Sequence, residues 1–301
     1  MKWLVITNND KLLTSIKESL LAADKKNRII TSDLDAKNLS KLKKDFKDLA
    51  GIFVFNEDED KLSDDKKSLL SSLLGFFAFD KIPLYTNSNI LQNNTLFTKD
   101  SINILKEDEI SSYISKKYKK MEEKSVQRLA KNSLLNRGIP FTSDCFATYI
   151  AKDKIEIVNE FLEAGMSVNS RDDMGVPMLN IACRNDNFEF TKMILDLGAD
   201  LNAVSDDRGY TAVMDAVWRG NEKITKFLIE KGADLNTINK EGQTNLILAV
   251  GANRENIVKL LAENGSDPDV KDMMGMSAYT YATLFKKERI VEILKPYHKE
   301  A

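Results

Sequence analysis

The sequence predicts two units of different fold class, a small α/β domain in residues 1–122 and an all-α repeat solenoid in residues 123–301. In the first part, short apolar runs alternate with stretches of helical periodicity, which is typical of a parallel sheet with crossover helices. In the second part the sequence resembles itself at a period of 33 or 34 residues, which is typical of stacked helical repeats. A chain of 301 residues with 43% hydrophobic residues can supply a core to each unit.

Apolar runs rich in β-branched and aromatic residues predict five strands, at residues 3–7, 28–31, 52–55, 82–85 and 95–98. Apolar residues at helical spacing predict four helices, near residues 12–21, 39–49, 69–79 and 106–124. Because strands that alternate with helices form parallel sheets covered on both faces, we expect a compact unit that resembles the flavodoxin-like or related doubly wound folds.

The first unit lacks the glycines of a phosphate site. Sheets of this kind bind ligands at the carboxyl ends of their strands, and a phosphate group there needs glycines so that backbone N–H groups can approach it. The unit holds only Gly51 and Gly75, and it contains neither a GxGxxG motif nor a P-loop. We therefore expect no nucleotide or other cofactor.

Two segments of this unit resemble known domains without their reactive residues. The positions that correspond to the acidic pair, aspartate, threonine and lysine of phosphoreceiver domains are Asn9, Asp10, Asn56, Thr86 and Lys99. An amide at Asn56 cannot be phosphorylated, and Asp58 or Asp60 can replace it only in a shifted register. The stretch 74–85 resembles the TIR and deoxyribosyltransferase-like group, but Leu73, beside Ser71, Ser72 and Leu74, stands where those enzymes carry a catalytic glutamate.

Four series of residues share one period in the second unit. Glycines recur at Gly165, Gly198, Gly232 and Gly265, and again at Gly175, Gly209, Gly242 and Gly275. Alanines recur at Ala182, Ala216, Ala249 and Ala282, and large apolar residues at Phe161, Ile194, Leu228, Leu261 and Leu294. In each unit a short helix, such as the one expected between Thr211 and Gly220, precedes a second amphipathic helix. One such pair cannot bury its own apolar face, so neighbouring pairs must stack.

The segments Met193–Asn202 and Phe227–Asn236 resemble the helix-and-turn signature of the ankyrin repeat family. The resemblance covers roughly residues 125–297 and implies five units, which start near residues 141, 174, 208, 241 and 274. It also implies an N-terminal cap helix at about 125–136 and a fifth unit that Pro296 cuts short. The family's Thr-Pro-Leu-His motif is never complete, since its histidine position holds Ala147, Asn180, Met214, Ile247 and Thr280, and its threonine position Asp144, Pro177, Thr211, Thr244 and Ser277.

Composition argues against several classes of function. The 44 basic and 46 acidic residues leave a net charge of −2, with neither half strongly basic, so we expect no nucleic-acid partner. A single histidine, His298, argues against a histidine base or a multi-histidine metal site. We expect Cys145 and Cys183 to be free in a reducing cytoplasm, and no apolar stretch reaches the length of a signal-peptide core or a membrane span.

Two runs of charge are interpreted as solvated. The acidic residues of 56–60, with Asp64 and Asp65, lack the spacing and the turn glycine of a calcium loop, so we expect no metal site there. The basic run 116–120 predicts the wet face of a helix, and contact with nucleic acid or an acidic partner is its alternative.

These observations favour a non-enzymatic scaffold that binds a protein partner through its repeats. One alternative is a nucleotide- or phosphate-responsive sensor or enzyme in the first unit, which the repeats direct to its target. The other is a structural role in homo-oligomer assembly.

The ankyrin resemblance implies that a partner contacts the hairpin tips and the exposed ends of the first helices. Trp, Tyr and Arg are enriched at interface hot spots, and Met suits an adaptable apolar contact. The candidate contact residues are therefore Arg184, Tyr210, Trp218, Arg219, Met273, Met274 and Met276. The alternative is that Trp218 packs on the fourth unit and that Leu284 and Phe285 pack against the C-terminal cap.

Overall fold

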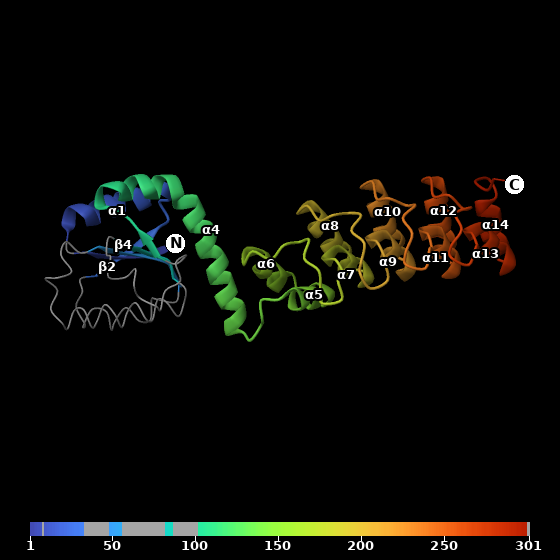
Figure 1. The fold of residues 1–301 in the computed structure, drawn as a ribbon, viewed down its shortest axis with the longest axis horizontal. Helices are drawn as coiled ribbons and strands as arrows, with labels where there is room; N and C mark the ends of the chain where they lie inside the picture. Colours follow the sequence, from blue (N-terminus) through green and yellow to red (C-terminus); the bar gives the residue numbers. More distant parts are fainter. Residues whose placement is uncertain (8, 33–47, 56–81, 87–101, 300–301) are drawn as a thin grey trace. The chain divides into compact units, whose positions relative to one another are not determined.

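The computed structural model describes residues 1–301 apart from residues 8, 33–47, 56–81, 87–101 and 300–301 (Figure 1). The chain divides into two compact units, Met1–Ser133 and Leu134–Ala301. None of the helices that the structure describes combines the length and the apolar composition needed to cross a lipid bilayer.

The first unit is built on a parallel five-stranded sheet, as the sequence predicts. Its strands are β1 (Lys2–Thr7), β2 (Arg28–Ser32), β3 (Leu49–Phe55), β4 (Leu84–Thr86) and β5 (Ile102–Ile104). They are hydrogen-bonded in the order β2-β1-β3-β4-β5, which is the order of flavodoxin-like sheets. The expected helix at 69–79, the expected strand at 95–98 and most of the expected helix at 39–49 lie outside the described residues.

Two strand boundaries differ from the expectation. β3 begins at Leu49, three residues early, where we expected the end of a helix. All seven of its residues are buried, and a strand buried on both faces has no alternation of polar and apolar residues to mark its start. β5 lies at residues 102–104, which we did not expect to be a strand, because three residues are too few to show a period.

One helix replaces the two expected at 106–124 and 125–136. This helix, α4, runs from Ile110 to Asn136, and the first glycine or proline after its start is Gly138. With α1 (Asp10–Ala23) it contributes to a core that includes Trp3, Phe53 and Tyr85. The lysines of the run 116–120 are exposed and Tyr118 is buried, so the run lies on the solvent-exposed face of a helix, as predicted.

The second unit is a stack of five helix pairs, which follow one another along the chain in Figure 1. The pairs are α5 (Ser143–Ala151) with α6 (Ile155–Glu163), α7 (Met178–Arg184) with α8 (Phe188–Asp196), α9 (Ala212–Arg219) with α10 (Glu222–Glu230), α11 (Asn245–Gly251) with α12 (Glu255–Glu263), and α13 (Ala278–Leu284) with α14 (Glu288–Leu294). We refer to them as repeats one to five.

The periodic residues occupy equivalent places in the repeats. The four alanines of the series and all five large apolar residues are fully buried. The eight periodic glycines all have φ between +70° and +92°, the left-handed region that side chains other than glycine rarely adopt. The period therefore records two constraints, a backbone turn at each end of the pair and a close helix contact in its middle.

Most first helices begin where the sequence predicts. Thr211, Thr244 and Ser277 each accept a hydrogen bond from a backbone N–H of the first turn, and Pro177 stands at the equivalent place in repeat two. Repeat one differs, because its cap is Thr142 and not Asp144, so α5 starts two residues early.

Asparagines of the repeat signature link each repeat to the next. The side-chain oxygens of Asn169, Asn202 and Asn236 accept hydrogen bonds from the backbone N–H groups of Asp200, Asp234 and Asp267, at 2.8, 2.9 and 3.3 Å. The signature therefore specifies the stack as well as the single turn.

We predict that Leu228→Ala lowers the free energy of unfolding of the repeats by about 2–5 kcal/mol, because its fully buried side chain leaves a cavity. The neighbouring Phe227 is the control, since it is only partly buried, against Phe188 at 5.3 Å between ring centroids, and Phe227→Ala should cost less. Hydrogen exchange should show lost protection spreading from repeat three to repeats two and four. Equal loss throughout residues 1–301 would contradict the division into two units.

Candidate functional site

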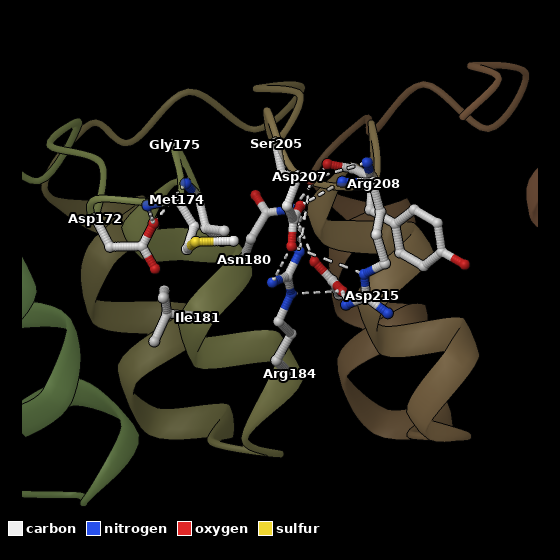
Figure 2. Close-up of polar contacts among 12 residues, drawn as sticks. Asp172, Met174, Gly175, Asn180, Ile181, Arg184, Ser205, Asp207, Arg208 and Asp215 are labelled. Atoms are coloured by element: carbon white, nitrogen blue, oxygen red, sulfur yellow. Dashed lines mark hydrogen bonds and ion pairs between the residues drawn. The ribbon is translucent and has the colours of Figure 1, made fainter. Parts of the chain in front are cut away.

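A charged network joins repeats two and three. Arg184, at the end of α7, contacts Asp207 through both terminal nitrogens, at 2.8 and 3.1 Å, and Asp215 of α9 through Nε at 2.9 Å. Figure 2 shows these groups converging below the hairpin of repeat three. A bidentate arginine with a second carboxylate fixes the distance between α7 and α9.

Asp215 lies at the centre of this network, with only 1% of its side chain exposed. It also accepts hydrogen bonds from Arg208 at 3.2 Å and from the amide of Asn180 at 2.8 Å. Asn180 stands at the family's histidine position, and its amide also donates to the carbonyl oxygen of Tyr210 at 2.9 Å. A different polar network thus links the repeats where the threonine–histidine pair is missing.

The two carboxylates of the network respond differently to burial. Desolvation raises the pKa of Asp215 in spite of the two guanidinium groups beside it. Desolvation opposes ionisation at Asp207 too, but hydrogen bonds from Arg184, Ser205 and the backbone of Arg208 outweigh it and hold the pKa of Asp207 well below its usual range. Asp207 is therefore the carboxylate whose charge stabilises the folded repeats.

The hairpin tips are held by side chains that accept backbone N–H groups. Asp172 accepts from Met174 and Val176, Asn239 from Glu241 and Gln243, and Asp272 from Met274 and Met276, at 2.8–3.1 Å. These bonds order the tips and leave the side chains of Met174 and Met274 pointing outward, 62% and 80% exposed.

The single histidine has a structural place. The Nδ1 atom of His298 lies 2.5 Å from Asp269, and its ring stacks on Tyr279 with 3.8 Å between centroids. Desolvation works against it, but hydrogen bonds from the backbone of Lys299 and from His298 lower the pKa of Asp269. This cluster ties the last turn of the chain to repeat five.

Two of the seven candidate contact residues belong to the interior. Arg184 is committed to the ion pairs described above. Tyr210 is 6% exposed, and the guanidinium of Arg208 lies 4.4 Å from the centre of its ring. Their side chains stabilise the contact between repeats and offer little surface to a partner.

The other five candidates lie at or near the surface. Met273 is 77% and Met274 80% exposed, Trp218 is half-exposed, Arg219 is exposed and Met276 is partly buried. Leu284 and Phe285, which were left out of the candidate set, are 61% and 59% exposed, and the ring of Phe285 stacks on that of Tyr281 with 5.9 Å between centroids. They stand one period after Gly251 and Ala252, at the exposed end of the first helix of repeat five, where the repeat register places them.

A shallow depression of about 320 Å³ lies between the tips of repeats three and four. Its wall includes the exposed side chains of Val204 and Ile238, with Lys240 at one side. The ammonium group of Lys240 donates to the backbone carbonyl of Asp206, which links the two tips. The depression is open and extends the tip surface without enclosing a ligand.

The positions weighed for chemistry in the first unit fall into two groups. Asn9 caps α1 by accepting from the N–H of Leu12, Asp10 is exposed and Thr86 is buried. Asn56, residues 58–60, 71–74 and Lys99 lie outside the described residues. Across the part of the chain that the structure describes, no group of His, Cys, Asp and Glu side chains is arranged to hold a metal ion.

Comparison with known proteins identifies the repeats. A family model described as ankyrin repeats (3 copies) matches residues 145–239 and 235–301. The chain is also similar to a curated ankyrin repeat-containing protein of Treponema pallidum (strain Nichols), with 34% identity over 153 residues. That match covers 51% of this chain and 51% of the relative, so the chain spans about half the length of the relative it matches.

We predict that the network makes the repeats sensitive to acid. The pKa of Asp207 is lower in the folded than in the unfolded chain, so its contribution to stability is present above the unfolded carboxyl pKa of about 3.9 and is lost as the pH falls below it. The raised pKa of Asp215 acts in the opposite direction, because the folded chain takes up that proton first.

Asp207→Asn isolates the first effect. At about pH 6 the variant should melt at a lower temperature than the wild type, and the difference should shrink as the pH is lowered toward about 3, because the unfolded wild type then binds a proton at Asp207 that the folded chain does not bind. Far-UV circular dichroism, which reports the helical content, follows the unfolding. A difference in melting temperature that stays constant with pH would show that Asp207 acts through its shape and not its charge.

Proposed function

The chain belongs to the ankyrin repeat family, and on that premise we propose that it is a non-enzymatic adaptor that binds a protein partner. The partner contacts the hairpin tips and the exposed ends of the first helices, which together we call the tip face. The whole activity is a proposal for this chain, because the chain matches only about half the length of the Treponema pallidum relative.

The exposed apolar side chains of the repeats carry this proposal. Soluble proteins expose single apolar residues everywhere, but a concentration of large ones on one face indicates an interaction site. Most of those in the second unit lie on the tip face, namely Met174, Val204, Trp218, Ile238, Met273, Met274, Leu284 and Phe285.

The rigidity of the tips supports the same proposal. Asp172, Asn239 and Asp272 each fix two backbone N–H groups, and the Arg184 network fixes the tip of repeat three. A surface that is ordered before binding loses less conformational entropy when the partner docks.

The free cysteines accord with a reducing compartment, so we propose a cytoplasmic location. Burial raises the pKa of the Cys183 thiol to about 12, which leaves it unreactive at neutral pH. The first unit is proposed as a non-catalytic companion domain of the flavodoxin-like class.

Trp218→Ala should weaken binding of the partner by about 1–2 kcal/mol, because the half-exposed indole offers a large apolar contact. The melting temperature should stay nearly unchanged. Leu197→Ala is the matched control, since Leu197 is 52% exposed at the end of α8, away from the tip face. Quantitative affinity capture from the source cell with the full chain and both variants measures the effect. Equal capture of the partner by the wild type and by Trp218→Ala would show that Trp218 is not part of the interface.

The purified full chain should show no NAD hydrolysis and no ribosyl transfer, because Leu73 replaces the carboxylate that such chemistry needs. The assay is chromatographic detection of nicotinamide release. Turnover that disappears on substitution within residues 56–60 or 71–75 would show that the chain is an enzyme and would contradict the proposal of a non-enzymatic adaptor.

A further inference from the structure

Gly251 has no structural reason to be glycine. It is the last residue of α11, its φ is not positive, and a Cβ added there would meet no other atom within 4 Å. Gly209 and Gly242, by contrast, have positive φ and neighbouring backbone within 3 Å of such a Cβ. Glycine within a helix is destabilising relative to alanine, so the fold alone would favour almost any other residue at 251.

The residues that flank Gly251 in the stack are large and apolar. One period before it stands Trp218 and one period after it Leu284, while Ala252 corresponds to Phe285. The helices that carry them, α9, α11 and α13, stand side by side in this order in Figure 1. Trp218, Leu284 and Phe285 are 49%, 61% and 59% exposed. Gly251 and Ala252 therefore place no large side chain at the positions between Trp218 on one side and Leu284 with Phe285 on the other, and we call these two positions the repeat-four gap.

Positive charge borders the repeat-four gap. Arg219 follows Trp218, Lys286 follows Phe285, and the guanidinium of Arg254 lies over Gly220. Within the described part of the chain, none of these three cations forms an ion pair, although the second unit as a whole has more acidic than basic residues. Of the carboxylates that begin the neighbouring outer helices, Glu222 accepts a hydrogen bond from Asn256 at 2.8 Å and Glu255 pairs with Arg289 at 3.7 Å, whereas Glu288 of α14 is exposed.

We infer that the repeat-four gap binds an acidic segment of the protein partner and takes up one large apolar side chain from it. The side chain packs between Trp218 and Leu284 over Gly251, and carboxylates beside it pair with Arg219, Arg254 and Lys286. Apolar burial at the centre with charge pairs at the rim is the usual arrangement of a binding hot spot. The inference rests on the proposed function and specifies its site and partner chemistry.

A library of random 12-residue peptides displayed on phage and selected on the immobilised full chain tests the inference. Selected sequences should share a large aliphatic or aromatic residue with Asp or Glu within a few positions on either side. Their binding should weaken as the salt concentration rises, because the carboxylates contact exposed cations.

Gly251→Leu should weaken this binding without harming the fold. The added side chain fills the repeat-four gap, so the affinity of the selected peptides should fall at least about tenfold, which corresponds to about 1.4 kcal/mol. Since leucine is the better helix former and open space surrounds the position, the melting temperature should stay the same or rise by about 2 °C. Lys226→Leu adds the same side chain to the exposed face of α10 and should leave binding intact.

A second variant, Arg219→Glu with Arg254→Glu, changes only exposed charges and should also lose the acidic peptides. Selection of basic or uncharged sequences, selection of none, or unchanged binding to Gly251→Leu would overturn the inference. The proposed function fails separately. If the partner captured from cells is lost on Trp218→Ala but kept by Gly251→Leu, the adaptor stands and only the repeat-four gap is wrong.

Discussion

No helix pair of the second unit can bury its apolar residues alone, and the rest of that unit follows from this constraint. Ala216 and Leu228 are fully buried only because repeats two and four cover repeat three. The asparagine bonds from Asn169 to Asp200 and from Asn202 to Asp234 serve the same need, because they set the spacing between neighbours. Stability and register are thus properties of the interfaces between repeats and not of any one repeat.

The interface between repeats two and three is held together partly by buried ion pairs. A buried ion pair stabilises a fold weakly, since the loss of hydration offsets much of the attraction, but an unpaired partner is strongly destabilising. Asp215 tolerates burial because Arg184, Arg208 and Asn180 all contact it. In repeat four the equivalent position is Leu248, which is buried without polar contacts from its side chain, so the network distinguishes one interface from the others.

Features that recur in every repeat could be predicted from the sequence, and features confined to a single interface or strand could not. The glycine, alanine and apolar series were all confirmed, because each marks a place that every repeat must fill in the same way. Arg184 was expected at the surface, and the structure pairs it with Asp207 and Asp215, which stand 23 and 31 residues away in the sequence. A periodic pattern cannot predict such a contact, because only one interface makes it. The start of β3 at Leu49 was missed for the related reason that a fully buried strand has no alternation to read.

Arginine has opposite roles in neighbouring repeats, and this difference separates structure from recognition. Arg184 and Trp218 occupy equivalent positions, yet the first is committed to two aspartates and the second is half-exposed. Arg219, one residue further, has no aspartate in reach because Asp215 is already bound by Arg184 and Arg208. A residue type enriched at interfaces is therefore informative only once its partners inside the stack are known. The equivalent positions in the next three repeats, Trp218, Gly251 and Leu284, have no such partners, so a binding partner and not the interior can determine the side chain there.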